Sequence, residues 1–206
     1  MPERFASIIA TALCLGAAPV LWVEAQAALV VRDAASTGIP TGPLRDPQLP
    51  WSIDSTRALA RLCDDALAPE IAGFAGANAM RTTVTRCTAF ATKANAAWPA
   101  DGVIALLQST IALGTGSIGL ALDHLERAQR AAPREGWQAE RRFRLAAHIL
   151  RSNDVGTLQG RTERALATEL PVLLATQSGA ELLAFYQAYD PTVHQLIERA
   201  VGSAPR

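Results

Sequence analysis

The chain has 206 residues, of which 50% are apolar and 5% aromatic, and its 19 basic and 19 acidic residues give a formal net charge of zero. A neutral chain has no bulk electrostatic attraction to nucleic acid, so we expect no nucleic-acid partner. After residue 27 about 180 residues remain, which is enough for one domain with a hydrophobic core.

An uncharged run of 19 residues, Phe5 to Val23, stands near the N-terminus. As a helix rising about 1.5 Å per residue, this run just crosses the hydrocarbon core of a bilayer. Two interpretations stay open. Ala25-Gln26-Ala27 fits the small-x-small rule for cleavage of a secretory signal at Ala27-Ala28, whereas the length of the run and Trp22 favour a retained transmembrane anchor.

Both interpretations export everything after this segment. We therefore expect a protein of the bacterial cell envelope, either anchored in the inner membrane and facing the periplasm or released into the periplasm. Residues 1–31 are the predicted signal peptide or membrane anchor. Residues 32–52 hold four prolines and two glycines without an apolar period, and they are predicted to form a Pro-rich linker.

Residues 53–202 are predicted to form one helical repeat-like domain. Apolar residues recur there at helical spacing, and no segment alternates as a half-buried strand would. Proline, glycine and capping residues divide the pattern. The first expected helix begins at Ser52 or Asp54 and contains Cys63, and the second contains Cys87 and ends near Trp98. Further helices are expected over residues 99–113, 117–132, 135–151, 161–169, 171–176, 179–188 and 191–201. The fold class is therefore all-α.

Cys63 and Cys87 are the two cysteines outside the N-terminal segment. Export places them in an oxidising compartment, where thiols on neighbouring helices form a disulfide. The alternative is a pair of buried thiols that act as small apolar residues. We favour the disulfide because export removes the reducing environment.

The segment from Asp101 to Arg134 resembles one tetratricopeptide unit, a pair of antiparallel helices that ends at a proline. With Pro133 as that proline, the small residues of the second helix fall on Ala121 and Ala128, and the large apolar residue falls on Leu125. Ser109 holds the small position of the first helix. The resemblance implies stacked antiparallel helix pairs, with residues 135–170 as a degenerate second unit.

The layout of an exported segment, a Pro-rich linker and a short helical domain also resembles that of small envelope proteins of bacterial exopolysaccharide synthesis and export. The residues behind this resemblance are Trp51-Ser52, the stretch 107–137 and Tyr189-Asp190-Pro191. The resemblance implies a role in exopolysaccharide synthesis or export.

Patterns for catalysis or cofactor binding were weighed and not adopted. The glycines of Gly114-x-Gly116-x-x-Gly119 match the dinucleotide-binding fingerprint, but that chemistry needs a preceding strand, and here the preceding residues have helical spacing. The histidines at 124, 148 and 194 have no cysteine or carboxylate at metal-ligand spacing. A lone catalytic carboxylate, such as Glu126 or Glu140, stays open. We expect no cofactor, no metal and no enzymatic activity.

A cluster of basic and aromatic residues marks the predicted helices 117–132 and 135–151. Guanidinium groups donate paired hydrogen bonds to carboxylates, phosphates and acidic sugars. The alternative is a solvated face with local ion pairs, such as Glu126 with Arg130. The candidate partner surface consists of Arg127, Arg130, Arg134, Trp137, Arg141, Arg142 and Arg144.

We therefore expect a non-enzymatic interaction or scaffold module of the envelope that binds a protein partner. Two alternatives stay open: direct binding of acidic polysaccharide through the arginine-rich helix pair, and an envelope enzyme with a carboxylate site.

Overall fold

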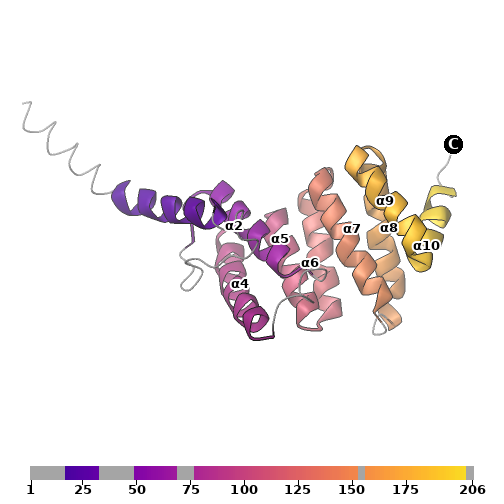
Figure 1. Cartoon of the computed structure of the whole chain (residues 1–206), viewed down its shortest axis with the longest axis horizontal. Helices are drawn as coiled ribbons and strands as arrows, with labels where there is room; N and C mark the ends of the chain where they lie inside the picture. The colour runs from indigo at the N-terminus through magenta and orange to yellow at the C-terminus, as the bar shows by residue number, and fades with distance from the viewer. Residues whose placement is uncertain (1–16, 33–48, 69–76, 153–155, 203–206) are drawn as a thin grey trace, which may run out of the picture. The chain divides into compact units, whose positions relative to one another are not determined.

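The computed structural model describes residues 17–32, 49–68, 77–152 and 156–202, and the regular structure in these ranges is entirely helical (Figure 1). This confirms the predicted all-α class. An N-terminal helix covers residues 17–32. The further elements are α2 (Ile53–Ala66), α4 (Ala77–Ala97), α5 (Gly102–Gly114), α6 (Ile118–Ala131), α7 (Gly136–Arg151), the 3-10 turn η1 (Gly156–Leu158), α8 (Gln159–Leu174), α9 (Gln177–Tyr189) and α10 (Pro191–Gly202).

These helices divide into two compact units, with the division after Trp98. The first unit contains the helix over residues 17–32 together with α2 and α4, and the second contains α5 to α10. The helical domain expected over residues 53–202 is therefore distributed over both units.

The predicted membrane-directing segment is described only in part. Residues 5–16 of the uncharged run lie outside the described residues, and so do residues 33–48 of the predicted linker. Among the helices that the structure does describe, none is both long and apolar enough to cross a membrane.

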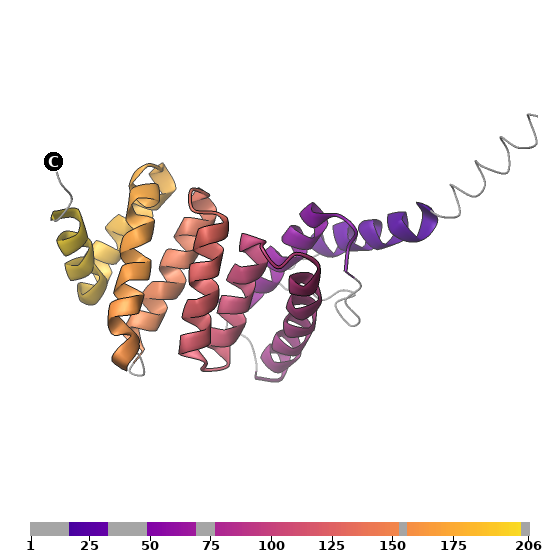
Figure 2. The same ribbon diagram turned by 180° about the vertical axis from the view of Figure 1, so that it is seen from behind.

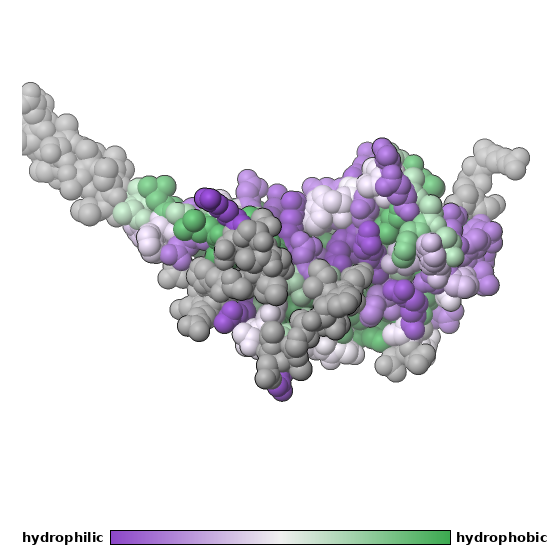
Figure 3. Space-filling model, in the orientation of Figure 1, coloured by the Kyte–Doolittle hydropathy of each residue, from purple (hydrophilic) through white to green (hydrophobic). Residues whose placement is uncertain are grey.

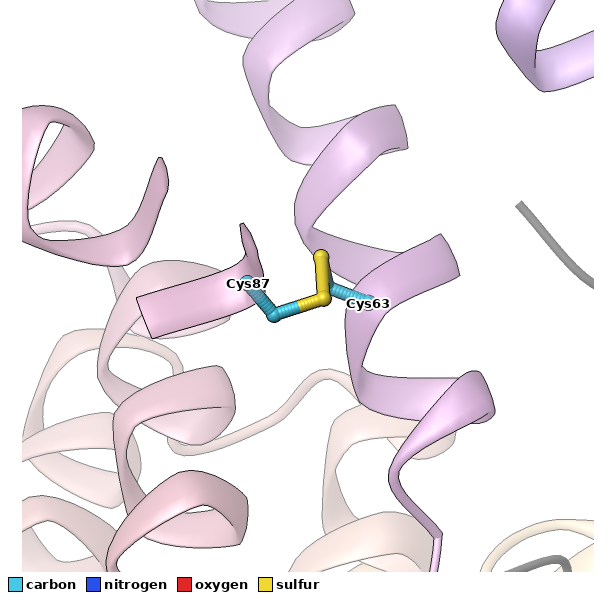
Figure 4. Close-up of a disulfide and its surroundings, with 2 residues drawn as sticks. All are labelled: Cys63 and Cys87. Atoms are coloured by element: carbon cyan, nitrogen blue, oxygen red, sulfur yellow. A yellow bond between two sulfur atoms is a disulfide. The ribbon is translucent and has the colours of Figure 1, made fainter. Parts of the chain in front are cut away.

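In the first unit, a disulfide joins α2 to α4. The sulfur atoms of Cys63 and Cys87 are bonded, and their Cα atoms lie 5.6 Å apart (Figure 4). Both residues are fully buried. At the start of α2, the Ser52 side chain accepts a hydrogen bond from the Ser55 amide at 3.1 Å, which confirms Ser52 as the N-cap. The predicted pairing of the two cysteines is confirmed.

In the second unit, α6, α7 and α8 lie side by side in both views of the chain (Figures 1 and 2). α5 packs most extensively on α6, and α7 on α8. The core between these helices is built mainly from alanine and leucine with one buried Phe143, which lets the helix axes approach closely. Ala121 and Ala128 are fully buried and Leu125 is almost so, as the helical pattern of residues 117–132 predicts.

Of the glycines at 114, 116 and 119, Gly116 lies in the turn between α5 and α6, Gly114 is the last residue of α5 and Gly119 lies in the first turn of α6. α5 ends with the Gly116 amide bonded to the Leu113 carbonyl and the Ser117 amide bonded to the Ala112 carbonyl, which is a Schellman motif. Gly116 supplies the positive φ of 77° that this motif needs. Ser117 precedes α6 but makes no capping hydrogen bond with its side chain, in contrast to the expectation.

One helix boundary was predicted wrongly. Residues 161–169 and 171–176 were expected as separate helices, but α8 is continuous from Gln159 to Leu174 with Pro171 inside it. Proline removes one helical hydrogen bond and its ring crowds the preceding turn. The Pro171 ring is exposed, while Leu170 and Leu173 beside it are buried, so packing of the opposite face offsets the cost.

Candidate functional site

Arg142 was predicted as part of the candidate partner surface, but its side chain is not on the surface of the protein. Its side chain is fully buried, and its Nε and Nη2 donate to the two carboxylate oxygens of Glu169 at 2.6 and 2.8 Å. Its Nη1 donates to the Ala132 carbonyl, at the C-terminus of α6, at 3.2 Å. Burial raises the pKa of the Glu169 carboxyl, against the opposing effect of Arg142. This arginine therefore joins α6, α7 and α8 inside the core.

The remaining predicted residues of α7 lie on the opposite side of the helix from Arg142. At about 100° per residue, Trp137, Arg141 and Arg144 fall within one quarter of the helix circumference. Glu140, His148 and Arg151 fall on the same face, and all six side chains are half-buried or exposed. The α7 face thus carries four basic groups and one tryptophan.

Two aromatic side chains of α9 are exposed on one stripe of that helix. Phe185 is 55% exposed and Tyr189 is 75% exposed, and their ring centroids lie 5.1 Å apart. Ser178 lies on the same stripe, seven residues before Phe185. Alanines at 180, 184 and 188 are also exposed, together with the polar Glu181 and Gln187.

Contacts at both ends place this α9 stripe beside the α7 face. The Ser178 hydroxyl donates to Glu140 at 2.6 Å near the start of both helices. Near their ends, Arg151 Nε lies 3.7 Å from an Asp190 carboxylate oxygen. Between these contacts, the rings of Phe143 and Tyr186 pack edge to face with centroids 5.3 Å apart.

Arg144 lies one helical turn after Glu140, between the two end contacts. Arg144 has no carboxylate partner in the described part of the chain. We call the surface formed by Arg144, Phe185 and Tyr189 the α7–α9 face. This surface combines one arginine with two exposed aromatic residues. Arginine and tyrosine are among the residue types that are enriched at interaction hot spots.

A second basic surface lies on α6 and the loop after it, at Arg127, Arg130 and Arg134. Arg130 and Arg134 are exposed, and the charge of Arg130 acts on the Glu126 carboxylate one helical turn earlier. Arg127 Nη2 donates to the Gln108 amide oxygen of α5, but its Nε is buried without an acceptor in the described chain. Burial and the neighbouring Arg130 lower the pKa of Arg127. We call these three residues the α6 arginine surface.

Two acidic side chains of α6 form ion pairs with an arginine of α8. Arg161 binds Glu126 through Nε and Asp123 through Nη2, each at 2.6 Å. These hydrogen bonds raise the pKa of Arg161, and the bond from Arg161 lowers the pKa of Glu126. Arg161 of α8 thus binds the two acidic side chains of α6.

The two carboxylates that the sequence left open as catalytic groups both have partners. Glu126 binds Arg161, and Glu140 accepts from Ser178. Within the described ranges, no group of three or more His, Cys, Asp or Glu side chains is arranged to hold a metal ion.

Comparisons with known proteins give no family. No family model, no curated protein and no solved structure matches this chain.

Sequence reasoning missed Phe185 and Tyr189 as candidates for the site. The two aromatics stand four residues apart in α9, a helix whose exposed positions also include three alanines, and both features are visible in the sequence. Apolar residues that extend beyond one face of a helix predict either burial or a partner. Sequence reasoning also missed the pairing of Arg142 with Glu169. A count of arginines in a segment does not show which of them lie on the buried face of the helix.

Proposed function

We propose that this protein is a non-enzymatic interaction module of the bacterial envelope that binds a protein partner through the α7–α9 face. The observation that carries this proposal is the exposure of Phe185 and Tyr189 on the side of α9 next to Arg144, a residue without a carboxylate partner in the ranges that the structure describes. Aromatic and arginine side chains contribute most of the binding energy at typical protein interfaces. The matching partner segment carries an apolar side chain for the rings and a carboxylate for the guanidinium.

We further propose that α5–α6, α7–α8 and α9–α10 are tetratricopeptide-like antiparallel pairs. The order of contacts supports this arrangement. Gly102 lies near Ala128 and Ala132, whereas Ser109, later in α5, donates to the earlier Ala121 carbonyl at 2.8 Å. Contacts between α7 and α9 run in the same order along both helices, as expected for the first helices of successive pairs.

In such a stack, the first helices line a concave surface whose side chains vary without disturbing the core. The α7–α9 face then lies in this surface. The proposed role in exopolysaccharide synthesis or export rests on the resemblance in sequence layout alone. The disulfide supports an oxidising compartment.

Photocrosslinking from single positions tests the α7–α9 face. A photoreactive residue is placed at Phe185 or at Tyr189 of the full chain in intact cells, and at Leu120 as an exposed apolar control on α6. We expect one adduct of the same mass from positions 185 and 189, its loss in an Arg144→Glu background, and no such adduct from position 120. Adducts of equal yield from all three positions would contradict the proposal.

A second candidate function is direct binding of acidic polysaccharide through the α6 arginine surface. Two observations favour an anionic ligand: Arg127 Nε is buried without an acceptor among the described residues, and Arg130 and Arg134 are exposed. The test is binding of the full chain to a polyuronate and to a neutral glucan. We expect polyuronate binding that weakens with salt and is lost in Arg130→Ala/Arg134→Ala, with Arg164→Ala as the exposed control.

A further inference from the structure

The helix over residues 17–32 has two different faces. On one face, Ala27 and Val30 are buried and Glu24 is half-buried. On the opposite face, Leu21 is 66% exposed, Trp22 is 66% exposed and Leu29 is 61% exposed. Glu24 is the sole charged residue between 17 and 31, so the exposed face carries no charge until Arg32. We call Leu21, Trp22 and Leu29 with the alanines between them the outer face. Figure 3 shows hydrophobic surface on this segment.

Glu24 attaches this helix to the start of α2. One carboxylate oxygen accepts from the Ser52 amide at 2.7 Å, and the other accepts from the Ser52 hydroxyl at 3.1 Å and from the Ser55 hydroxyl. Ser52 is also the N-cap of α2, so the carboxylate lies at the positive end of that helix. The one charge of the segment is therefore satisfied by the folded unit, and the outer face has a fixed direction relative to α2.

The proposed cleavage site lies inside this arrangement. Cleavage after Ala27 would remove Glu24 and its three hydrogen bonds to α2. Ala27 itself is buried, so cleavage would also end the packing of this helix on the rest of the first unit. A carboxylate held by three donors on a later helix is expected of a retained segment, because a removed signal peptide makes no contacts in the mature fold.

A lipid surface fits the outer face better than a protein does. The uncharged run from Phe5 leads directly into this helix, and the outer face continues it without a charge that a polar partner could match. Trp22 and the neighbouring Trp51 are both exposed, and tryptophan is enriched at the membrane interface. Arg32 is exposed at the end of the helix, where its guanidinium can meet lipid phosphates.

We propose that residues 17–32 are retained in the mature protein and lie along the lipid interface through their outer face, so that Glu24 holds α2 against the bilayer. An interfacial helix normally exposes its polar side to water. Here the opposite side packs on the protein instead. This inference concerns the first unit and does not depend on the partner of the α7–α9 face.

Quenching by brominated lipid tests the outer face. The full chain is reconstituted in vesicles of phosphatidylethanolamine and phosphatidylglycerol with bromine on the acyl chains. The readout is the fluorescence of a tryptophan introduced by Leu29→Trp, and Thr92→Trp, at an exposed position of α4, is the matched control. Both variants carry phenylalanine in place of the four native tryptophans. We expect loss of fluorescence for Leu29→Trp and none for Thr92→Trp.

Two results would overturn the proposal. Equal fluorescence of Leu29→Trp in brominated and ordinary lipid would show that the outer face does not meet the bilayer, including the case in which a protein covers it. An intact mass that begins at Ala28, measured on protein recovered from the envelope of cells that make the full chain, would show that the segment is removed. We expect a mass that includes Glu24.

Discussion

Arg142 and Glu169 form a buried, two-bonded ion pair between α7 and α8, with nitrogen–oxygen distances of 2.6 and 2.8 Å. A third bond from Arg142 reaches the Ala132 carbonyl at the end of α6. Three helices of the second unit thus meet at one guanidinium. Because a charge without a counter-ion is costly in a core, the pair fixes how these helices pack on one another.

We expect Glu169→Gln to lower the free energy of unfolding by about 3–5 kcal/mol, since the Arg142 charge stays buried without its counter-ion. Arg199→Ala is the control, because Arg199 is exposed and lies 3.7 Å from Glu163, and its loss should cost under about 1 kcal/mol. Denaturant unfolding followed by circular dichroism measures both. Combining Glu169→Leu with Arg142→Met should recover most of the loss, and no recovery would mean that the ion pair is not the cause.

The helices themselves follow from the sequence because local rules set them. Apolar spacing, Asp190 before Pro191 and the glycines at 114 and 116 act within a few residues, and the structure has helix ends at each of them. Pro171 shows the limit of such rules. The buried Leu170 and Leu173 pack on other helices, and this non-local burial overrides a local helix breaker.

The candidate site was predicted only in part, for a related reason. Composition marked the arginine-rich segment, but Arg142 and Arg144 differ by about 200° around α7, and this angle decides which one is buried. Glu169 is the reason that a buried arginine is tolerated, and it is 27 residues away in the chain. Phe185 and Tyr189 lie beside Arg144 because α7 and α9 pack together, which no local pattern states.

Removing the disulfide should destabilise the first unit. The two cysteines have a sequence separation of 24, and the loop that they close stabilises the fold by about 3 kcal/mol in the chain-entropy model. We expect Cys63→Ala/Cys87→Ala to lower the unfolding free energy of this unit by that amount. Fluorescence of Trp98, at the end of α4, follows it in a background without the other tryptophans. Treatment of the wild-type chain with a reductant should produce the same loss, and an unchanged unfolding curve after full reduction would count against this stabilisation.

Substitution by alanine should have different effects on stability at Gly179 and at Gly114. A Cβ at Gly179 would lie 2.4 Å from the Leu173 carbonyl oxygen and 2.6 Å from its Cα, and backbone atoms cannot move aside. We expect Gly179→Ala to destabilise the second unit by about 1–3 kcal/mol. A Cβ at Gly114 would meet nothing within 4 Å, so Gly114→Ala should be neutral or stabilise by up to about 1 kcal/mol. Thermal unfolding measures both, and equal midpoints for the two variants would refute the predicted clash.

The contributions of His194 and His124 to the free energy of unfolding should change with pH in opposite directions. A hydrogen bond to the Gln187 carbonyl, with a second to Glu198, raises the pKa of His194 above 6.5, while burial and then Arg127 lower the pKa of His124 below 6.5. The folded state therefore holds the His194 proton more tightly than the unfolded state does. The stabilisation from His194 is complete below pH 6.5 and is lost as the pH rises through its folded pKa.

His124 has the reverse sign, because protonation is disfavoured in the folded state. Well above pH 6.5, His124 is neutral in both the folded and the unfolded state and does not affect stability. As the pH drops below 6.5, the unfolded state binds the proton first, so the free energy of unfolding falls. Nuclear magnetic resonance titration of the imidazole signals measures both pKa values. Glu198→Gln should lower the pKa of His194 only in part, because the Gln187 contact is the larger cause, and should leave that of His124 unchanged. If the two histidines titrate together near 6.5, the contacts assigned to them here do not form in solution.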